Sequence, residues 1–448
     1  MTTQRPELHD VVGIGFGPAN IALAIAAEEL HPHLDIVFVE RNARAGWQEE
    51  MLLPESDIQN HPLRDLVTPR NPRSRYTFVN FLFEQGRLFE HLNLPLTHPL
   101  RVEYRQYVAW VAQHFAAKVR YGHDVRAIVP VLDGERIGAW RVDCEDGRSV
   151  HARSLVVAPG RTPRIPASFA AAAGDARVVH LTRFLGAFEA VKARVAAPRI
   201  AVVGGSQSAV ELLLHVAGNL PRGEVVGINR NFGFRQKDTS PFSDEVYFPE
   251  FVDTFFHASP EQKRRLRAEL APTNYSSADR DVLDALYVQL YRNRILHKDG
   301  LSVRHLTAIT DVRCDADAVH LTLAHTIDGG HERVPFDLVV LATGFKDLGA
   351  GVGDEPWPAL MAGLAPHLAL AGGVLDVGLD YRVRLQEPAG TAHAPAFLNG
   401  LCESTHGMGD AGSFSLLSLR SATIADSLAT LLAAAPADRA TQPSPSIA

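Results

Sequence analysis

The residues best suited to chemistry stand near the start of the chain, in the sequence VVGIGFGPAN of residues 11–20. An apolar run leads into a turn that contains Gly13, Gly15 and Gly17, and an alanine-rich helical segment follows from Pro18. A glycine turn between a strand and a helix lets backbone N–H groups and the helix N-terminus approach a pyrophosphate closely. The pattern G-x-G-x-x-G is incomplete because its third glycine position holds Pro18. These residues predict a dinucleotide-binding site.

An acidic residue, Glu40, ends the next apolar run, residues 35–39. A carboxylate at this place accepts hydrogen bonds from a ribose 2′-hydroxyl, and its charge repels a 2′-phosphate. The first site is therefore expected to hold FAD or NAD rather than NADP. The alternative is a glycine turn in some other kind of α/β protein.

A second strand, turn and helix follow each other in RIAVVGGSQSAVE, residues 199–211. Gly204 opens the turn, and Ser206 stands where the second glycine usually lies. The following strand, residues 224–228, ends at Asn229 and Arg230 rather than at an acid. Arginine after that strand suits a 2′-phosphate, so the second site is expected to hold NADPH and the first FAD. A surface arginine without a ligand is the alternative.

The order of these segments predicts an α/β chain with two Rossmann-like dinucleotide-binding domains, for FAD and NADPH, and a smaller, mostly helical substrate-binding insertion. An apolar strand that ends in Ala-Thr-Gly, with Thr343 and Gly344, is typical of the crossing between such domains in flavoproteins. We expect a discontinuous FAD domain over 1–185 and 331–435, an NADPH domain over 186–235 and 300–330, and the insertion over 236–299.

Composition restricts the class of protein. The chain has 448 residues, and its net charge of −7 argues against nucleic-acid binding. The three cysteines are widely spaced and form no metal-binding or C-x-x-C pattern. We therefore expect no metal, and we expect a reducing, cytoplasmic location. No signal peptide or membrane span is visible, and the tail over 436–448 is expected to be disordered.

Further motifs run through nearly the whole chain. They are GWQ (46–48), IQNHPLRDL (58–66), PRNPRSRYTFVNFL (69–82), SPFSDEVYFPEFVD (240–253), LATGF (341–345) and THG (405–407). Together with the two glycine turns, this ordered set resembles the N-hydroxylating flavin monooxygenases, which include the ornithine and lysine hydroxylases of siderophore biosynthesis.

The resemblance implies a reaction. NADPH reduces FAD, O₂ then gives a C4a-hydroperoxyflavin that retained NADP⁺ shields, and a neutral primary amine takes the distal oxygen. The protein must exclude water and hold the amine in place. The expected cofactor contacts are Gly13, Gly15, Gly17, Pro18, Glu40, Trp47 and Gln48 for the first site, Gly204, Ser206, Gln207, Ser208 and Arg230 for the second, and Thr343 and Gly344 in the crossing segment.

The resemblance places substrate contacts on Gln59, Arg64, Asp244 and Asn274, with Gln59 and Asn274 nearest the reaction. Ornithine hydroxylases typically have a lysine at the position of Arg64, and it pairs with the substrate's α-carboxylate. Arginine preserves that pairing and adds a bidentate fork, so Arg64 favours an amino acid over a diamine. The alternative is an arginine bonded to neighbouring backbone.

Three departures from the ornithine pattern favour L-aspartate, oxidised repeatedly to nitrosuccinate, as the first choice. They are Arg64 itself, the polar segment Asn60-His61-Pro62, and Asp244 in place of the usual asparagine. His61, with Arg292 or Arg294, would then grip a second carboxylate, although Asp244 would repel one. L-ornithine N5-hydroxylation, or L-lysine N6-hydroxylation, is the alternative.

Two other classes of protein fit less well. A flavin disulfide reductase needs a redox-active cysteine pair, and Cys144, Cys314 and Cys402 offer none. A dinucleotide-binding sensor without activity would have no use for Gln59 and Asn274. The expected partners are an amino-acid substrate and further copies of this chain in a dimer or tetramer, with no nucleic acid or membrane.

Overall fold

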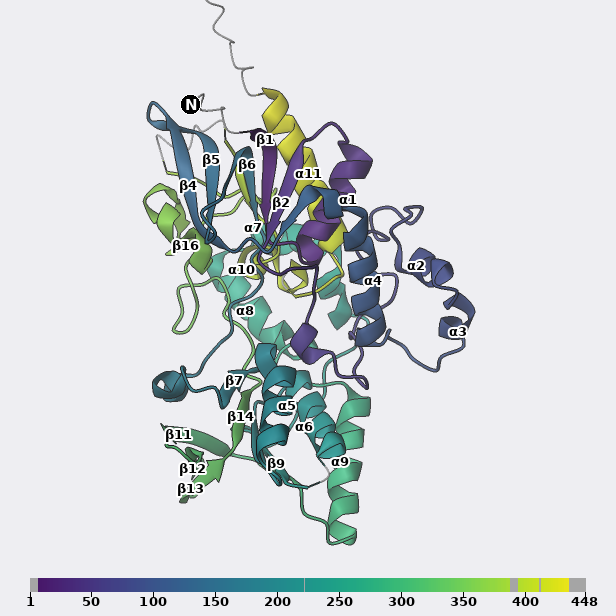
Figure 1. The fold of residues 1–448 in the computed structure, drawn as a ribbon, viewed down its shortest axis with the longest axis vertical. Coiled ribbons are helices and arrows are strands. Elements are labelled where there is room, and N and C mark those ends of the chain that lie inside the picture. The colour runs from purple at the N-terminus through teal and green to yellow at the C-terminus, as the bar shows by residue number, and fades with distance from the viewer. Residues whose placement is uncertain (1–6, 221, 387–393, 411, 435–448) are drawn as a thin grey trace, which may run out of the picture.

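The computed structural model describes residues 7–220, 222–386, 394–410 and 412–434 (Figure 1). The predicted disordered tail, residues 436–448, lies outside the described residues. Two units, each built on a largely parallel sheet, follow one another along the long axis of the molecule (Figure 1). The α/β fold with two nucleotide-binding-type sheets is as predicted.

The first sheet has the strand order β3-β2-β1-β6-β5-β4. Strand β6 pairs in parallel with β1, and its last residues pair with β17, whereas β5 runs antiparallel to β6. The strands are β1 (Leu8–Ile14), β2 (Ile36–Glu40), β3 (Val119–Tyr121), β4 (Val125–Asp133), β5 (Arg136–Cys144), β6 (Ser149–Val157) and β17 (Ala396–Leu398).

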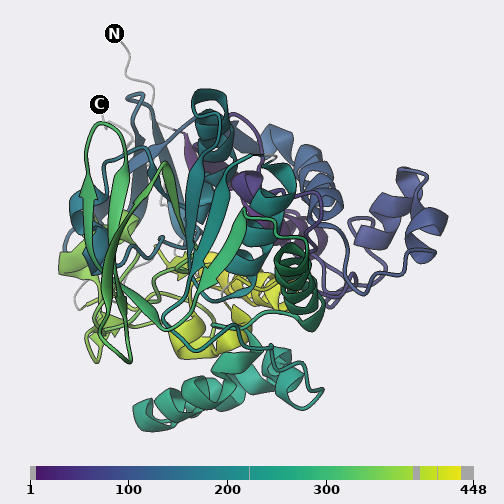
Figure 2. The ribbon, with the colours of Figure 1, turned by 90° about the horizontal axis from the view of Figure 1, so that it is seen from below.

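Helices cover this sheet because its central strands are apolar on both faces. Helix α1 (Pro18–Leu30) is rich in alanine and packs beside α11 (Leu417–Ala434), which comes from the other end of the chain. Helix α4 (Arg101–His114) contacts α1. The short helices α2 (Phe78–Glu84) and α3 (Leu88–Leu92) project away from the body of the molecule (Figure 2).

The second sheet is wholly parallel, with the order β10-β9-β8-β14-β7. Its strands are β7 (Val178–His180), β8 (Arg199–Val203), β9 (Glu224–Ile228), β10 (Leu301–Arg304) and β14 (Leu338–Leu341). One face packs on helices α5 (Phe184–Arg194) and α6 (Gln207–Asn219). The other face packs on an antiparallel sheet of β11 (Thr307–Cys314), β12 (Val319–His325) and β13 (His331–Phe336).

The sheets divide the chain differently from the predicted boundaries at two strands. Strands β7 and β14 pair with each other and β14 pairs with β8, so both belong to the second sheet. The sequence boundaries put residues 178–180 and 338–341 in the first domain. Their apolar character fits either sheet, and only the pairing between distant segments decides which sheet they join.

The insertion contacts both units. Helix α7 (Pro249–His257) packs on the short helix α10 (Glu403–His406) of the first unit, whereas α9 (Arg280–Ile295) packs on α6 of the second. Helix α8 (Pro260–Leu270) lies between them in sequence and has a Ser259–Gln262 capping box. The remaining elements are β15 (Leu370–Ala371), β16 (Val374–Leu375) and 3-10 helices over Glu49–Met51, Ala116–Lys118, Ala167–Ala172, Leu181–Arg183, Ser243–Tyr247, Ala271–Thr273, Ala359–His367 and Met408–Asp410.

A buried ion pair joins the two units. Arg101 at the start of α4 donates to both carboxylate oxygens of Glu211 on α6, at 3.1 and 2.9 Å. Arg101 also donates to the carbonyl oxygens of Met51 and Asp57, each at 2.9 Å. Both side chains are buried, so neither charge has water as an alternative partner.

Replacing Arg101 with alanine is expected to lower the free energy of unfolding by about 3–5 kcal/mol, because it leaves the Glu211 carboxylate buried and unpaired. Urea denaturation followed by circular dichroism measures this change. The matched control is Arg105→Ala on the same helix, whose partner Glu49 is exposed, and it should cost no more than about 1 kcal/mol. Equal effects of the two variants would contradict a special role for the buried pair.

Candidate functional site

A cavity of about 2620 Å³ lies where the parallel strands of both sheets end. Its wall combines the β1–α1 turn, the β8–α6 turn, the insertion and the segment before α11. Ligands of open α/β sheets bind at this place, outside the carboxyl ends of the strands. One cavity therefore serves both predicted nucleotide turns.

The first turn presents bare backbone to the cavity. Gly15 has φ +82°, and a Cβ there would come within 2.4 Å of the Ala158 carbonyl oxygen. Gly17 has open space where a Cβ would stand, and both Gly17 and Pro18 line the cavity. Only glycine suits the positive φ and the close approach at position 15.

Gly13 behaves differently from the prediction. It does not line the cavity, and a Cβ on it would lie 2.4 Å from the ring of Phe38. Gly13 therefore permits the close packing of β1 against β2, a role that the motif alone does not separate from ligand contact.

Glu40 stands at the end of β2, buried but at the cavity wall. One carboxylate oxygen accepts the Phe16 N–H at 2.8 Å, and the other accepts from the backbone N and the side-chain Nδ2 of Asn42, at 2.8 and 2.7 Å. These donors fix a negative charge beside the first turn, the place at which a ribose hydroxyl would be bound. Trp47 and Gln48 line the same wall.

The second turn has the same close approach. A Cβ on Gly204 would lie 2.4 Å from the Ala342 carbonyl oxygen. Ser206 stands at the N-cap of α6, and its side chain makes no capping hydrogen bond. Ser206, Gln207 and Ser208 all line the cavity, and their contact with a ligand stays a prediction.

Asn229 supplies a free donor beside this turn. Its Oδ1 accepts the Asn231 N–H at 2.9 Å, which fixes the orientation of the amide. Its Nδ2 is buried and has no hydrogen-bond partner among the described residues. The amide would lie 3.1 Å from a Cβ on Gly205, and neighbouring Arg230 is exposed and lines the cavity. An orphaned donor and a cation fit a phosphate rather than a bare ribose hydroxyl.

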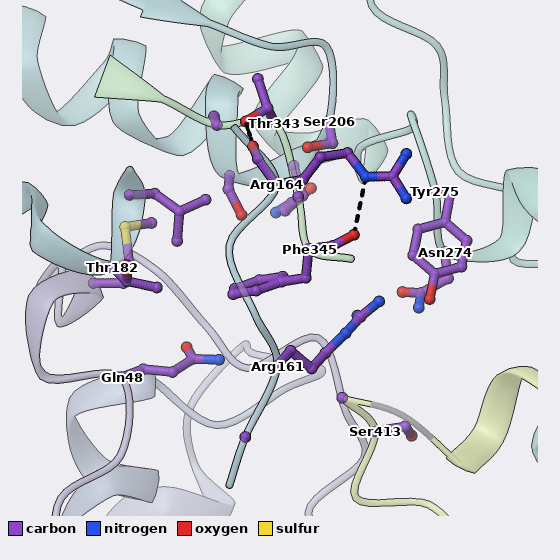
Figure 3. A pocket seen from close by; sticks show the side chains of 18 of the residues that line it. Gln48, Arg161, Arg164, Thr182, Ser206, Asn274, Tyr275, Thr343, Phe345 and Ser413 are labelled. Atoms are coloured by element: carbon purple, nitrogen blue, oxygen red, sulfur yellow. Dashed lines mark hydrogen bonds between the residues drawn. The ribbon is translucent and has the colours of Figure 1, made fainter. Parts of the chain in front are cut away.

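The two chain segments that cross between the units are bonded to each other (Figure 3). Thr343 Oγ1 donates to the Arg164 carbonyl oxygen at 2.5 Å, and the Arg164 N–H donates to the Gly344 carbonyl oxygen at 3.0 Å. Gly344 has φ +73°, in the region that favours glycine. Thr343 and Gly344 line the cavity, as the Ala-Thr-Gly sequence predicts for a crossing segment.

Arg64 lies in the cavity wall without an acidic partner. Its guanidinium carbon stands 5.8 Å from the centroid of the Tyr247 ring, and its Nη1 reaches Ser415 Oγ at 3.5 Å. Among the described residues no carboxylate lies within 4.0 Å of Arg64. Asp244 is also near Tyr247, whose pKa rises to about 12 because of burial and, next, the Asp244 charge. Arg64 and Asp244 thus offer a cation and an anion near one phenol.

Gln59 and Asn274 also line the cavity, and Asn274 belongs to the insertion. The Gln59 side chain donates to Asp279 Oδ2, and Asp279 N–H donates to Gln207 Oε1 at 2.8 Å. Gln59 has φ +52°, and its N–H donates to Asp57 Oδ1 at 2.8 Å, which fixes this unusual backbone conformation. These contacts link the predicted substrate residue to the second nucleotide turn.

The cations predicted for a second substrate carboxylate are not assembled. Arg292 and Arg294 are exposed in the last turn of α9 and do not line the cavity. His61 lines the cavity, but burial and the nearby Arg64 charge lower its pKa, so it is neutral at neutral pH. Their place within the insertion could not show which face of α9 points to the cavity.

Two cavity residues, Tyr247 and Glu403, escaped the sequence prediction. Tyr247 follows Asp244 by one helical turn within the motif SPFSDEVYFPEFVD, and Glu403 directly precedes the Ser-Thr-His-Gly sequence that contains THG. The spacing to Asp244 could have pointed to Tyr247. Nothing in the sequence indicated that the Glu403 carboxyl would be buried.

A family profile described as L-lysine 6-monooxygenase/L-ornithine 5-monooxygenase matches residues 7–347. The L-ornithine N(5)-monooxygenase of Burkholderia cepacia is 38% identical over 421 residues, which cover 90% of this chain and 91% of that protein. The solved ornithine hydroxylase of Pseudomonas aeruginosa is 33% identical, with a TM-score of 0.86 over 95% of this chain and 100% of that one.

A second similar structure is the ornithine N-hydroxylase of Kutzneria sp. 744 with reduced FAD, NADP⁺ and L-ornithine. It is 32% identical, with a TM-score of 0.86, and the match covers 95% of this chain and 99% of that one.

The second turn predicts selective binding of a 2′-phosphate. Replacing Arg230 with alanine, or Asn229 with aspartate, is expected to weaken binding of 2′,5′-ADP about tenfold or more and to leave 5′-AMP binding nearly unchanged. Isothermal titration calorimetry of both nucleotides measures this difference. The control is Arg194→Ala, an exposed arginine at the end of α5 that does not line the cavity. Equal losses for the two nucleotides would show that neither residue recognises the phosphate.

Proposed function

The chain belongs to the L-lysine 6-monooxygenase/L-ornithine 5-monooxygenase family, and we propose that it hydroxylates the side-chain amine of L-ornithine. It is a flavin-dependent N-hydroxylating monooxygenase that uses FAD and NADPH, with O₂ as co-substrate. The observation that carries the choice of an amino acid is Arg64, a cavity guanidinium without a carboxylate partner among the described residues.

The residues present fit both cofactors. Gly15, Gly17 and the rigid Glu40 carboxylate suit the FAD nucleotide, and the unpaired Asn229 Nδ2 with Arg230 suits NADPH. When bound, FAD reduced by NADPH activates dioxygen and supplies the oxygen atom. The protein's own contribution is to hold the amine, exclude water and adjust protons.

Arg64 binds the α-carboxylate of the substrate in this proposal, and Asp244 binds the α-ammonium. Both groups lie near Tyr247, so an amino-acid head would lie close to the phenol with its charges matched. Asn274 and Gln59, further along the same wall, would then face the side-chain amine. The apolar side of the cavity includes Trp47, packed edge-on against Phe414 with ring centroids 5.3 Å apart.

The first-choice substrate of the sequence analysis, L-aspartate, is not supported. The Burkholderia, Pseudomonas and Kutzneria relatives are ornithine enzymes. The second carboxylate of aspartate would also meet no extra cation, because His61 is neutral and Arg292 and Arg294 do not line the cavity. Asp244 would also repel it. Ornithine, or the one-methylene-longer lysine that the family description names, fits better.

In the described residues no helix is both long and apolar enough to cross a membrane. The cytoplasmic location and the dimer or tetramer stay predictions. Exposed apolar side chains on α2 and α3, among them Phe83, Phe89 and Leu92, offer a surface for the expected contact between subunits.

The proposed function is tested by NADPH oxidation and hydroxylamine formation with ornithine, lysine, aspartate and putrescine in parallel. We expect hydroxylamine in a near one-to-one ratio to NADPH with ornithine, and NADPH consumption without hydroxylamine with aspartate. A hydroxylated product from aspartate, or none from either basic amino acid, would refute the proposal.

Replacing Arg64 with alanine is expected to raise the KM for ornithine by the equivalent of about 2–4 kcal/mol, because the substrate carboxylate loses its charged partner. The KM for putrescine, which has no carboxylate, should hardly change. Steady-state kinetics on both substrates measures the contrast. Arg73→Ala, an exposed arginine of the same loop region, is the matched control. A parallel rise in both KM values would mean that Arg64 acts on structure rather than on the carboxylate.

A further inference from the structure

A buried carboxyl group, that of Glu403, lines the cavity although no role has yet been given to it. Glu403 begins the short helix α10 and is only 3% exposed. The hydroxyl of Tyr275 donates a hydrogen bond to Glu403 Oε2. Tyr275 also lines the cavity and directly follows Asn274, the residue expected to face the substrate amine.

The other charged groups around Glu403 are Arg161, Asp347 and Arg267. Asp347 is bonded to both arginines, with Arg161 Nη2 at 3.0 Å and Arg267 Nη2 at 2.9 Å from its two oxygens. Figure 3 shows Arg161 and Tyr275 directed toward one another beside Asn274. Both arginines are thus paired with Asp347. The group that donates a hydrogen bond to Glu403 at the cavity wall is the Tyr275 phenol.

Burial raises the pKa of Glu403 to about 7, against the opposing effects of Arg161 and the Tyr275 hydrogen bond. Burial and the Glu403 charge raise the pKa of Tyr275 well above its ordinary value. The phenol therefore keeps its proton at neutral pH, whereas the carboxyl group exchanges one. A neutral hydroxyl between a ligand and a carboxylate passes protons on and does not store them.

The reaction needs such an acceptor. An alkylammonium group has a pKa of about 10.4 in water, and only the unprotonated amine has a lone pair to offer oxygen. Of the other carboxylates in the cavity wall near the insertion, Asp347 is bonded to two arginines and Asp279 to Gln59, whereas Asp244 lies near Arg64 and Tyr247, where the amino-acid head is placed.

We propose that the Glu403 carboxylate takes up the proton that the substrate's side-chain ammonium loses, with the Tyr275 hydroxyl as the relay. The inference rests on the proposed function, since it concerns the same amine. One N–H bond of the ammonium breaks and its electron pair stays on nitrogen. The proton binds the phenol oxygen while the phenol's own proton moves to Glu403. An ammonium and a carboxylate become an amine and a carboxylic acid, with no change in net charge and no oxidant required.

The transfer suits a cavity with little water. Two opposite charges that are held in a medium of low dielectric both lose solvation, and conversion to two neutral groups removes that cost. Asp244 and Arg64 keep their charges for the amino-acid head, so the neutral pair forms only at the reacting end.

The test counts protons released when L-ornithine binds the holoenzyme loaded with FAD and NADP⁺. Isothermal titration calorimetry in buffers of different ionisation enthalpy gives this number at about pH 6 and about pH 8.5. We expect the wild type to release about one proton at the lower pH, where Glu403 is already protonated, and about none at the higher pH, where Glu403 accepts it. Glu403→Gln should release about one proton at both pH values.

The pH dependence of binding provides a second reading. The wild-type affinity for ornithine should rise about tenfold per pH unit below about pH 7, where a proton is released, and level off above it, where Glu403 keeps the proton; in Glu403→Gln it should go on rising up to about pH 8.5. The kcat for hydroxylamine formation should fall at least tenfold in Tyr275→Phe, which lacks the relay, with KM changed much less. Tyr275→Phe keeps the carboxyl group, so its proton count should stay as in the wild type even though its turnover slows.

The matched control is Glu90→Gln, an exposed glutamate on α3, which should leave proton count and turnover unchanged. A proton count in Glu403→Gln equal to that of the wild type, or a wild-type count near zero at both pH values, would overturn the proposal. In either case hydroxylamine formation from ornithine would still support the proposed function. Absence of hydroxylamine from the wild type would instead refute the proposed function itself.

Discussion

The site depends on the hydrogen bonds between the two chain segments that cross from one sheet to the other, which contain Arg164 and Thr343. Thr343 Oγ1 donates to the Arg164 carbonyl oxygen, and the Arg164 N–H donates to the Gly344 carbonyl oxygen. Arg161 forms an ion pair with Asp347 across the same seam. Each segment leaves the carboxyl end of a strand in one sheet for the other sheet. Because the seam holds both ends together, two nucleotide turns face one cavity and a hydride donor and its acceptor can meet there.

Charge is distributed unevenly around this cavity. At the head-group end, Arg64 and Asp244 are opposite charges close to one phenol and have no ion-pair partner within 4.0 Å among the described residues. At the other end, Asp347 is saturated by two arginines and Glu403 is buried beside a phenol. A zwitterionic head with an uncharged tail matches this arrangement, and a dicarboxylate does not. The same reasoning explains why polar residues before Arg64 misled the substrate prediction, since polarity alone does not make a cation.

The nucleotide turns could be predicted from the sequence because their requirements are local. Positions 15 and 204 need glycine because a Cβ on Gly15 or Gly204 would meet a backbone carbonyl oxygen. The strand before each turn and the helix after it are indicated by short-range patterns of apolar residues. Arg292 and Arg294 could not be placed, because the outward face of α9 is set by its packing on α6. Strands β7 and β14, the packing role of Gly13 and the burial of Glu403 likewise depend on contacts between segments far apart in the chain.

The insertion has one end on each unit, since α7 packs on α10 and α9 packs on α6. Any rocking of one sheet against the other would strain both attachments and alter the width of the amine pocket. Occupancy of the nicotinamide nucleotide and affinity for the amine are then thermodynamically linked, and linkage works in both directions by the same factor. The strength of that linkage would depend on how stiffly the insertion holds the two sheets, and not on either binding surface alone.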